Sequence, residues 1–303
     1  MVNWKKKRKI NEIGFLISVF AIPVAAFLLF WVYVNFQSIL NAFRIEKRGE
    51  IIWSLNNWKN FWLDLTEPSP MTDMKLILKN TLIFFSTNMF VIIPISLIFS
   101  YFLFKKIKCY KIFRIVFFAP SIISAAVLAT LYKFMLNPSI GGFLSKFLSL
   151  FNNGEEINYL VTDGKALKAV VAYCIWTGLS VDIVLFNGAM ERVPKTIIES
   201  AQIDGVNSVQ EFIRILFPMI WPTISTIIIT TTAGIFTASG PLLLLTGGAH
   251  QTNTISFWIY QQVQAQVSPY YPSTVGLVFT LVGVPIVLIV KRLVESIYKE
   301  VQY

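Results

Sequence analysis

Six apolar segments, each long enough to cross a membrane, constrain the fold of this chain more than any other feature. A helix needs roughly 20 apolar residues to cross the hydrocarbon core of a bilayer. A soluble domain carries about 25% charged residues, whereas this chain carries 14% and is 55% hydrophobic. The sequence therefore predicts an all-α, polytopic membrane protein with six transmembrane helices. The segments are 13–36, 76–104, 114–136, 167–190, 215–239 and 271–291.

The Lys and Arg residues are unevenly distributed between the two sides that six spans define. Six spans place both termini on one side, and that side holds most of the 26 basic residues. The last loop on the other side, residues 240–270, holds none. Because basic loops stay on the cytoplasmic side, we expect cytoplasmic N- and C-termini. This bias and anionic lipid explain the net charge of +10, so no nucleic-acid partner is required.

The N-terminal segment predicts an uncleaved first span. Basic residues at 5–9 precede an apolar run, as in a signal peptide, but the run exceeds the 7–15 residues of such a peptide's apolar region. The expected organisation is then a basic tail (1–12), a first span with an extracellular loop (13–70), a membrane core (71–295) and a C-terminal tail (296–303).

A polar segment interrupts the apolar sequence between the fourth and fifth spans. A helix can start near Pro194, since proline is tolerated in a first turn, and run to Ile203. Gly205 can end that helix in the left-handed conformation. Ser208 can cap a second helix, with Glu211 three residues later completing a capping box. Residues 193–214 therefore predict a helix–turn–helix at the cytoplasmic membrane surface.

The sequence lacks the motifs of the common catalytic and metal sites. It contains no phosphate-binding loop and no GxSxG elbow, and a single histidine, His250, cannot form a zinc motif. Cys109 and Cys174 are far apart, so apolar packing is the default reading for both. We assign no catalytic residue, metal or cofactor to this chain. If ATP drives its activity, another chain must hydrolyse the ATP.

The polar segment resembles the signature loop of the permease subunits of binding-protein-dependent ABC importers. That loop has a Glu-Ala-Ala sequence followed four residues later by Gly; here Ser200 replaces the first of the two alanines, a small-for-small change. Asp204, Gly205 and Phe212 are similar to the sugar-uptake branch, the family of the maltose and glycerol-phosphate importers. Weaker similarities to this branch occur at 55–58, 80–82, 136–141 and 245–254.

The order of these features is similar to the maltose-importer subunit whose membrane core contacts sugar. One departure weakens any inference about the substrate: Ser239-Gly240-Pro241 stands where the branch often has Asp. An oligosaccharide, a monosaccharide derivative and a glycerol-phosphate-like solute therefore all stay open.

This resemblance implies a type I ABC importer permease fold with a cytoplasmic coupling helix in a bacterial cytoplasmic membrane. The implied partners are a second, homologous permease in a heterodimer, two cytoplasmic ATPase subunits that bind Mg-ATP, an extracytoplasmic solute-binding protein, membrane lipid and a carbohydrate. ATP hydrolysis would drive alternating access. The residues implied in ATPase coupling are Glu199, Ser200, Ala201, Asp204, Gly205, Phe212 and Pro218.

Polar residues recur at helical spacing in spans four and five, where they either line a sugar path or pack small residues against neighbouring helices. Asp182, inside span four, is either a functional carboxylate or a residue near the inner interface that is hydrated or paired with Arg192 or Lys195. A self-sufficient secondary transporter or channel is the alternative function. Two observations argue against it: intramembrane ionisable groups are scarce, and the sequence has no obvious inverted repeat. The candidate path residues are Tyr173, Trp176, Thr177, Ser180, Asp182, Asn187, Thr226 and Thr230.

Overall fold

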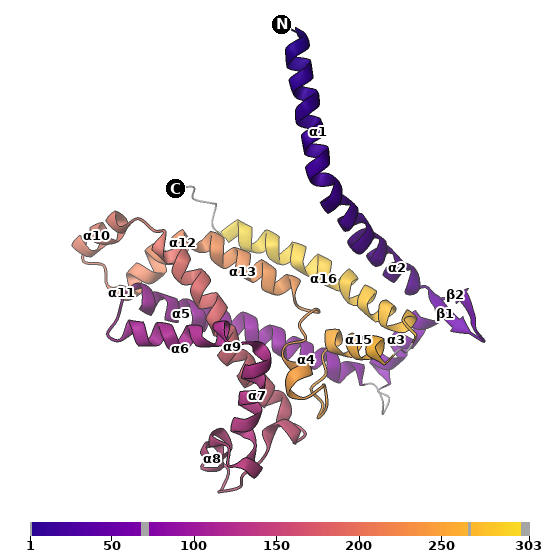
Figure 1. Cartoon of the computed structure of the whole chain (residues 1–303). Helices are drawn as coiled ribbons and strands as arrows, with labels where there is room; N and C mark the ends of the chain where they lie inside the picture. The colour runs from indigo at the N-terminus through magenta and orange to yellow at the C-terminus, as the bar shows by residue number, and fades with distance from the viewer. Residues whose placement is uncertain (1, 68–72, 266–267, 298–303) are drawn as a thin grey trace. The chain divides into compact units, whose positions relative to one another are not determined.

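The computed structural model describes residues 2–67, 73–265 and 268–297. The chain forms two compact units, one of Met1–Thr66 with Gln262–Val278 and the other of Glu67–Gln261 with Phe279–Tyr303. Figure 1 labels the helices and strands described below. The expected boundary at 70/71 and most of the expected C-terminal tail lie outside the described residues.

The first unit begins with one long helical segment. α1 (Val2–Ala26) continues through the π-helical turns of η1 (Phe27–Tyr33) into α2 (Val34–Asn41). The part from Glu12 to Asn41 is long and apolar enough to cross a membrane. The helix starts before residue 13, so the basic N-terminal residues are helical and continuous with the segment that can cross the membrane.

A short β-hairpin follows this helix, so the described chain is mostly rather than entirely α-helical. β1 (Arg44–Lys47) pairs antiparallel with β2 (Glu50–Trp53). Gly49 in the turn has a φ of +83°, which glycine adopts without a Cβ penalty. α3 (Asn56–Thr66) comes next, and its Trp58 Nε1 donates to the Ala42 carbonyl at 3.1 Å.

The second unit contains the remaining predicted spans. α4 (Met74–Thr87), η2 (Asn88–Ile92) and α5 (Ile93–Phe104) form one apolar helical segment of 31 residues. α9 (Ala166–Glu191) is a second unbroken candidate span, and α16 (Tyr270–Ile297) starts in the first unit and ends in this one. The shorter elements are α6 (Tyr110–Ile122), α7 (Ala125–Leu136), η3 (Pro138–Ile140), α8 (Phe143–Ser149), η4 (Tyr159–Val161), α10 (Lys195–Ile203), α11 (Ser208–Gln210), η5 (Glu211–Leu216), α12 (Phe217–Met219), α13 (Trp221–Ala233), α14 (Leu242–Leu245) and α15 (Ile255–Gln264).

Two of the six predicted spans are bent. α6 and α7 meet at 108°, where Ile123 has an extended backbone conformation and Ser124 is the non-helical N-cap of α7. Ser208–Met219 and Trp221–Ala233 meet at 70°. Pro222 follows this second break, and its ring and missing N–H prevent a regular helix from continuing through it. The described residues thus contain four unbroken helical segments long and apolar enough to span a membrane, and six spans if each bent pair forms one.

Small residues bring α5 and α9 close together. The Ser100 hydroxyl donates to the Ile183 carbonyl at 3.1 Å, and Ser96 and Ser100 are fully buried. A Cβ on Gly178 would lie 2.9 Å from the Ile92 side chain. This close, hydrogen-bonded contact is typical of helix pairs in membranes, and it ties the position of α9 to that of α5.

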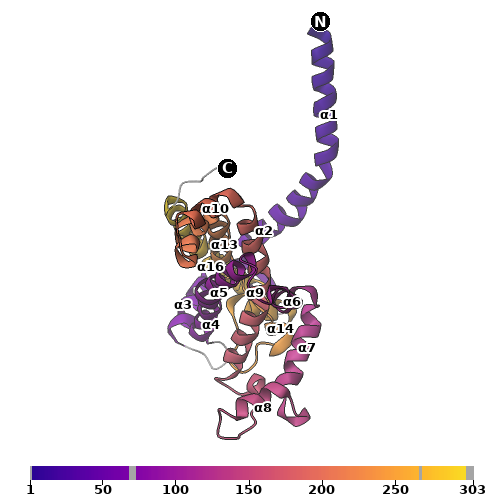
Figure 2. The ribbon, with the colours of Figure 1, turned by 90° about the vertical axis from the view of Figure 1, so that its left-hand side faces the viewer.

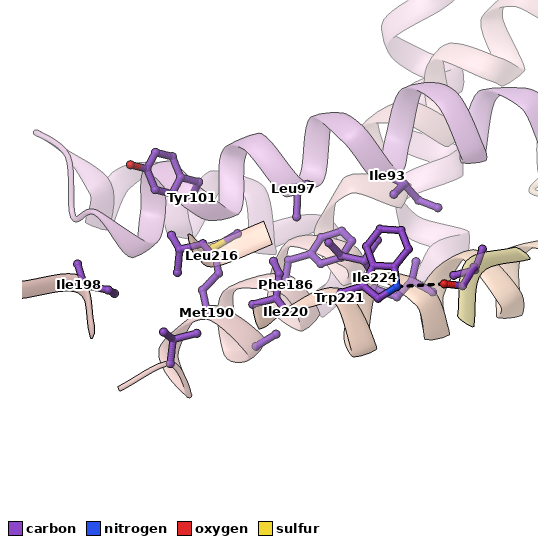
Figure 3. Close-up of a cluster of buried hydrophobic side chains, with 14 residues drawn as sticks. Ile93, Leu97, Tyr101, Phe186, Met190, Ile198, Leu216, Ile220, Trp221 and Ile224 are labelled. Atoms are coloured by element: carbon purple, nitrogen blue, oxygen red, sulfur yellow. Dashed lines mark hydrogen bonds between the residues drawn. The ribbon is translucent and has the colours of Figure 1, made fainter. Parts of the chain in front are cut away.

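A buried apolar cluster connects these spans to the polar segment (Figure 3). Ile198 of α10 reaches the cluster from the polar segment, and Trp221 Nε1 donates to the Val294 carbonyl of α16 at 3.1 Å. α10 and α8 lie far apart in both views, with α8 at the bottom of each picture (Figures 1 and 2). The other members labelled in Figure 3 are Ile93, Leu97, Tyr101, Phe186, Met190, Leu216, Ile220 and Ile224.

Two buried polar residues of α4 fix the loop before α15. The Asn80 amide donates to the carbonyls of Gln251 and Asn253 at 2.8 and 2.9 Å. The Thr81 hydroxyl accepts from the Ile255 N–H at 3.0 Å. Asn80 and Thr81 therefore have a structural role that explains why polar side chains occur within an apolar span.

Candidate functional site

The polar segment forms two helical pieces joined by a turn, the surface helix pair (residues 195–216). α10 follows Pro194, which is its N-cap rather than its first helical residue. Ile198 and Ala201 of α10 are buried, whereas Glu199 and Ser200 are exposed. The first helix therefore packs on the bundle through Ile198 and Ala201, and the Glu199 carboxylate faces outward.

The turn after α10 has the hydrogen bonds of a Schellman motif. The Gly205 N–H donates to the Gln202 carbonyl and the Val206 N–H to the Ala201 carbonyl, both at 3.1 Å. Gly205 has a φ of +75°, and a Cβ there would meet no atom of this chain within 4 Å. The predicted helix end at Gly205 is confirmed, and the exposed Asp204 and Gly205 lie at the tip of the pair.

The predicted capping box is wrong by one residue. The Asn207 side chain accepts from the Gln210 N–H at 2.9 Å, and the Gln210 side chain accepts from the Asn207 N–H at 3.2 Å. Ser208 is therefore the first residue of α11 rather than its cap. Glu211 is unable to reach back to the cap because its carboxylate is engaged elsewhere.

Glu211 is buried and paired with a lysine from another span. The residue is 1% exposed, and its Oε2 lies 2.8 Å from Lys105 Nζ at the end of α5. The Tyr101 hydroxyl donates to the Ser208 carbonyl at 2.9 Å, and the Tyr101 ring lies 4.9 Å from that of Phe212. Sequence reasoning missed these partners, since no local spacing connects positions about 106 residues apart.

Four large apolar side chains of the surface helix pair are exposed in this chain, the least of them Ile197 at 37%. Ile203 is 87% exposed, Val209 65% and Ile213 56%. They are interspersed with the polar residues Glu199 and Asp204, a pattern expected of a surface that contacts another protein. The other two predicted coupling residues, Phe212 and Pro218, are half-buried.

The predicted path residues on α9 lie in several environments. Tyr173 is 3% exposed and packs with Tyr132 and Trp176, at centroid distances of 5.1 and 6.0 Å. Ser180 is fully buried, and its hydroxyl has no hydrogen-bond partner within the described part of the chain. Asn187 is buried and donates to the Glu191 carboxylate at 2.9 Å. Tyr173, Ser180 and Asn187 are therefore all buried within the described helix bundle.

The threonines of the predicted path donate to the backbone of their own helices. The hydroxyls of Thr177, Thr226 and Thr230 donate to carbonyls four residues earlier, at 3.0, 2.7 and 2.8 Å. Thr226 and Thr230 are also exposed on α13, so their remaining lone pairs are accessible from outside the chain. Thr177 is half-buried.

Asp182 is half-buried in α9. Among the residues that the structure describes, no ion pair joins it to Arg192 or Lys195. Arg192 Nε donates instead to the Gly188 carbonyl at 3.2 Å. The structure therefore does not contain the ion pair that was one explanation of this carboxylate.

A cavity of about 480 Å³ lies between α4 and α9, near the end of the unit opposite the surface helix pair. Its lining is mostly apolar but includes Lys79, Lys168 and His250, none of which belongs to the predicted path. His250 Nδ1 lies 2.9 Å from the Asp163 carboxylate. Basic side chains on an apolar floor can hydrogen-bond a polar or anionic solute.

The described residues contain no group of three His, Cys, Asp or Glu side chains that could hold a metal ion. The long apolar helices, two bent helix pairs and an exposed helix pair are the features of a multi-pass membrane protein. A family model described as "binding-protein-dependent transport system inner membrane component" matches residues 76–302, and the chain belongs to this family. It is thus a multi-pass inner-membrane permease component and not an enzyme.

Curated proteins from several bacteria are similar to this chain. The multiple sugar-binding transport system permease protein MsmF of Streptococcus mutans is 30% identical over 193 residues, which cover 61% of this chain and 64% of MsmF. The sn-glycerol-3-phosphate transport system permease protein UgpA of Brucella suis is 25% identical over 235 residues, 77% of this chain and 78% of UgpA. The match therefore spans slightly less than two thirds of the first relative.

Two solved structures share the fold. One is a chain of a bacterial alginate ABC transporter in complex with an alginate pentasaccharide-bound periplasmic protein, with a TM-score of 0.79, 20% identity and coverage of 96% of this chain and 98% of that chain. The other is a chain of a bacterial ABC transporter involved in alginate import, with a TM-score of 0.79, 21% identity and coverage of 99% and 100%.

Proposed function

We propose that this chain is one permease subunit of an ATP-driven importer that takes up a carbohydrate delivered by an extracytoplasmic binding protein. The observation that carries the proposal is the exposed surface helix pair, where Glu199, Asp204 and Gly205 face outward beside the unpartnered Ile203 and Val209. Family membership supports the same role. A carbohydrate substrate is supported by the sugar and glycerol-3-phosphate relatives.

The proposed complex contains a second, homologous permease and two cytoplasmic ATPase subunits. The distribution of Lys and Arg supports cytoplasmic termini and a cytoplasmic surface helix pair. Each ATPase subunit receives one such pair, and closure of the ATPase dimer moves it. Because Ile198 anchors α10 in the buried cluster, that movement reaches the spans and switches the path between inward- and outward-facing states.

Purification of the tagged chain from its native host in mild detergent tests this proposal. A second permease and an ATPase should be retained, and addition of the binding protein with its sugar should stimulate ATP hydrolysis in proteoliposomes. Uptake should be measured for a neutral oligosaccharide, glycerol 3-phosphate and a uronate oligosaccharide. A lone chain that transports without an ATPase would instead establish a secondary transporter.

The exposed hydroxyl of Thr230 gives a test of the proposed path. Thr230→Val removes one hydroxyl from an accessible face without leaving a buried group unpaired, so we expect the apparent KM of uptake to rise about fivefold, the equivalent of one hydrogen bond of about 1 kcal/mol. Tyr173→Phe should act in the same direction if the phenol contacts the sugar. Thr232→Val, on a buried face, is the matched control. Unchanged uptake kinetics in both test variants would exclude these residues from the path.

A further inference from the structure

We propose that Tyr101, Lys105 and Glu211 are positioning residues that make the C-terminal end of α5 move together with the second helix of the surface pair. This inference rests on the proposed function, in which an ATPase moves that pair. None of the three was among the residues that the sequence assigned to coupling. The three residues form an ion pair and hydrogen bonds with defined geometry, whereas α10 contacts the bundle through apolar side chains.

The two helices of the surface pair are attached to the bundle in different ways. α10 rests on it through the apolar side chains of Ile198 and Ala201. Apolar contacts have no preferred direction, so they hold α10 against the bundle without fixing its orientation. The second helix is held by an ion pair and a hydrogen bond at its start. A displacement of the second helix must therefore break those bonds or carry α5 with it.

Glu211 has strong reasons to keep its partner throughout the movement. Its carboxylate is 2% exposed, and a buried charge is costly unless it is paired. Lys105 Nζ lies 2.8 Å from Oε2, and the Tyr101 hydroxyl lies 3.5 Å from Oε1. Separation of the helices would leave this carboxylate buried and unpaired, so the pair is expected to stay together.

The contact residues have the spacing of two helix faces that meet. Tyr101 and Lys105 are four residues apart at the end of α5. On the second helix, Glu211 and Phe212 lie three and four residues after Ser208, which places all three on one face. The π-helical turns of η5 begin at Glu211. π-helical turns are frequent at functional sites, and here they place the carboxylate against α5.

α5 passes the movement on to α9. The Ser100 hydroxyl, one residue before Tyr101, donates to the Ile183 carbonyl of α9. α9 carries most of the proposed path residues, so one continuous set of contacts leads from the surface pair to that path. The predicted consequence is that loss of the Lys105–Glu211 pair lowers uptake per ATP hydrolysed, while the ATPase subunits stay bound to the exposed face of α10.

Charge variants test this inference in the purified, reconstituted complex. Glu211→Lys and Lys105→Glu should each retain the ATPase subunits and lower the ratio of solute transported to ATP hydrolysed at least tenfold. The double variant, which restores an ion pair with reversed charges, should recover that ratio to within about threefold of wild type. Wild-type ratios in both single variants, or no recovery in a double variant that assembles normally, would overturn the inference.

A covalent link gives a second, independent test. In a background of Cys109→Ser and Cys174→Ser, Lys105→Cys with Glu211→Cys should uncouple uptake from ATP hydrolysis, and reaction with a short bismaleimide should restore coupling because the link replaces the ion pair. Lost or unrestored uptake after cross-linking would show that the two positions must separate, which contradicts the inference. Failure of the wild-type chain to retain an ATPase would instead refute the proposed function itself.

Discussion

Gly205→Arg is expected to lower uptake more than tenfold while leaving the chain inserted and folded. A side chain at a φ of +75° strains the turn by about 1–2 kcal/mol. A Cβ at this position meets no atom of this chain within 4 Å. We therefore expect the arginine mainly to weaken binding of the ATPase subunit, and each 1.4 kcal/mol of lost binding energy lowers the affinity tenfold. Uptake and ATPase retention are the measurements.

Gly154→Arg is the matched control for Gly205→Arg. Gly154 has a φ of +84° and also no atom within 4 Å of a Cβ, but it lies in the loop between α8 and η4, away from the surface helix pair. The Gly154→Arg variant should lose the same amount of folding stability as Gly205→Arg but should still retain the ATPase subunits. Equal losses of uptake in the two variants would mean that turn strain, rather than docking, explains the effect at Gly205.

Gly142→Ala is expected to destabilise the junction of α7 and α8 severely. An added Cβ would lie 2.5 Å from the carbonyl oxygens of Phe134 and Met135, and backbone atoms cannot move aside as the tip of a side chain can. Overpacking of this kind costs about 1–3 kcal/mol or more. The Tm in detergent should fall by about 5 °C or more.

The neighbouring Gly141→Ala separates this steric effect from ordinary glycine strain. Gly141 has a φ of +69°, but its nearest contact is the flexible Lys146 Nζ at 3.4 Å. Gly141→Ala should lower the folding stability only by the strain of a left-handed alanine, about 1–2 kcal/mol. Its Tm should therefore fall less than that of Gly142→Ala. The reverse order of the two Tm values would contradict the packing described at this junction.

The spans and the turn at Gly205 could be predicted because their causes are local. Apolar length predicts a span, and Asp204-Gly205 after an amphipathic segment predicts a helix end. The bends were harder to predict from the sequence. The break at Ile123 and Ser124 contains no glycine and lies three residues after Pro120 within a continuous apolar run. Local chemistry there permits both a straight and a bent helix, and packing decides between them.

The capping error shows where local patterns become ambiguous. Asn207 with Gln210 and Ser208 with Glu211 both match a capping box, and sequence alone gives no reason to prefer either. The structure prefers the first because Lys105, from a distant span, pairs with Glu211. Periodicity likewise placed Thr226 and Thr230 on one face but did not reveal that both hydroxyls donate to their own helix.

Uptake by the reconstituted complex, with each energy source supplied alone, tests the central claim most directly. Proteoliposomes would contain either trapped ATP and no ion gradient, or a proton or sodium gradient and no ATP, with the binding protein and labelled sugar outside. The account predicts uptake with ATP alone that disappears without the binding protein. Gradient-driven uptake in the absence of ATP would contradict it and make Asp182 the first residue to study.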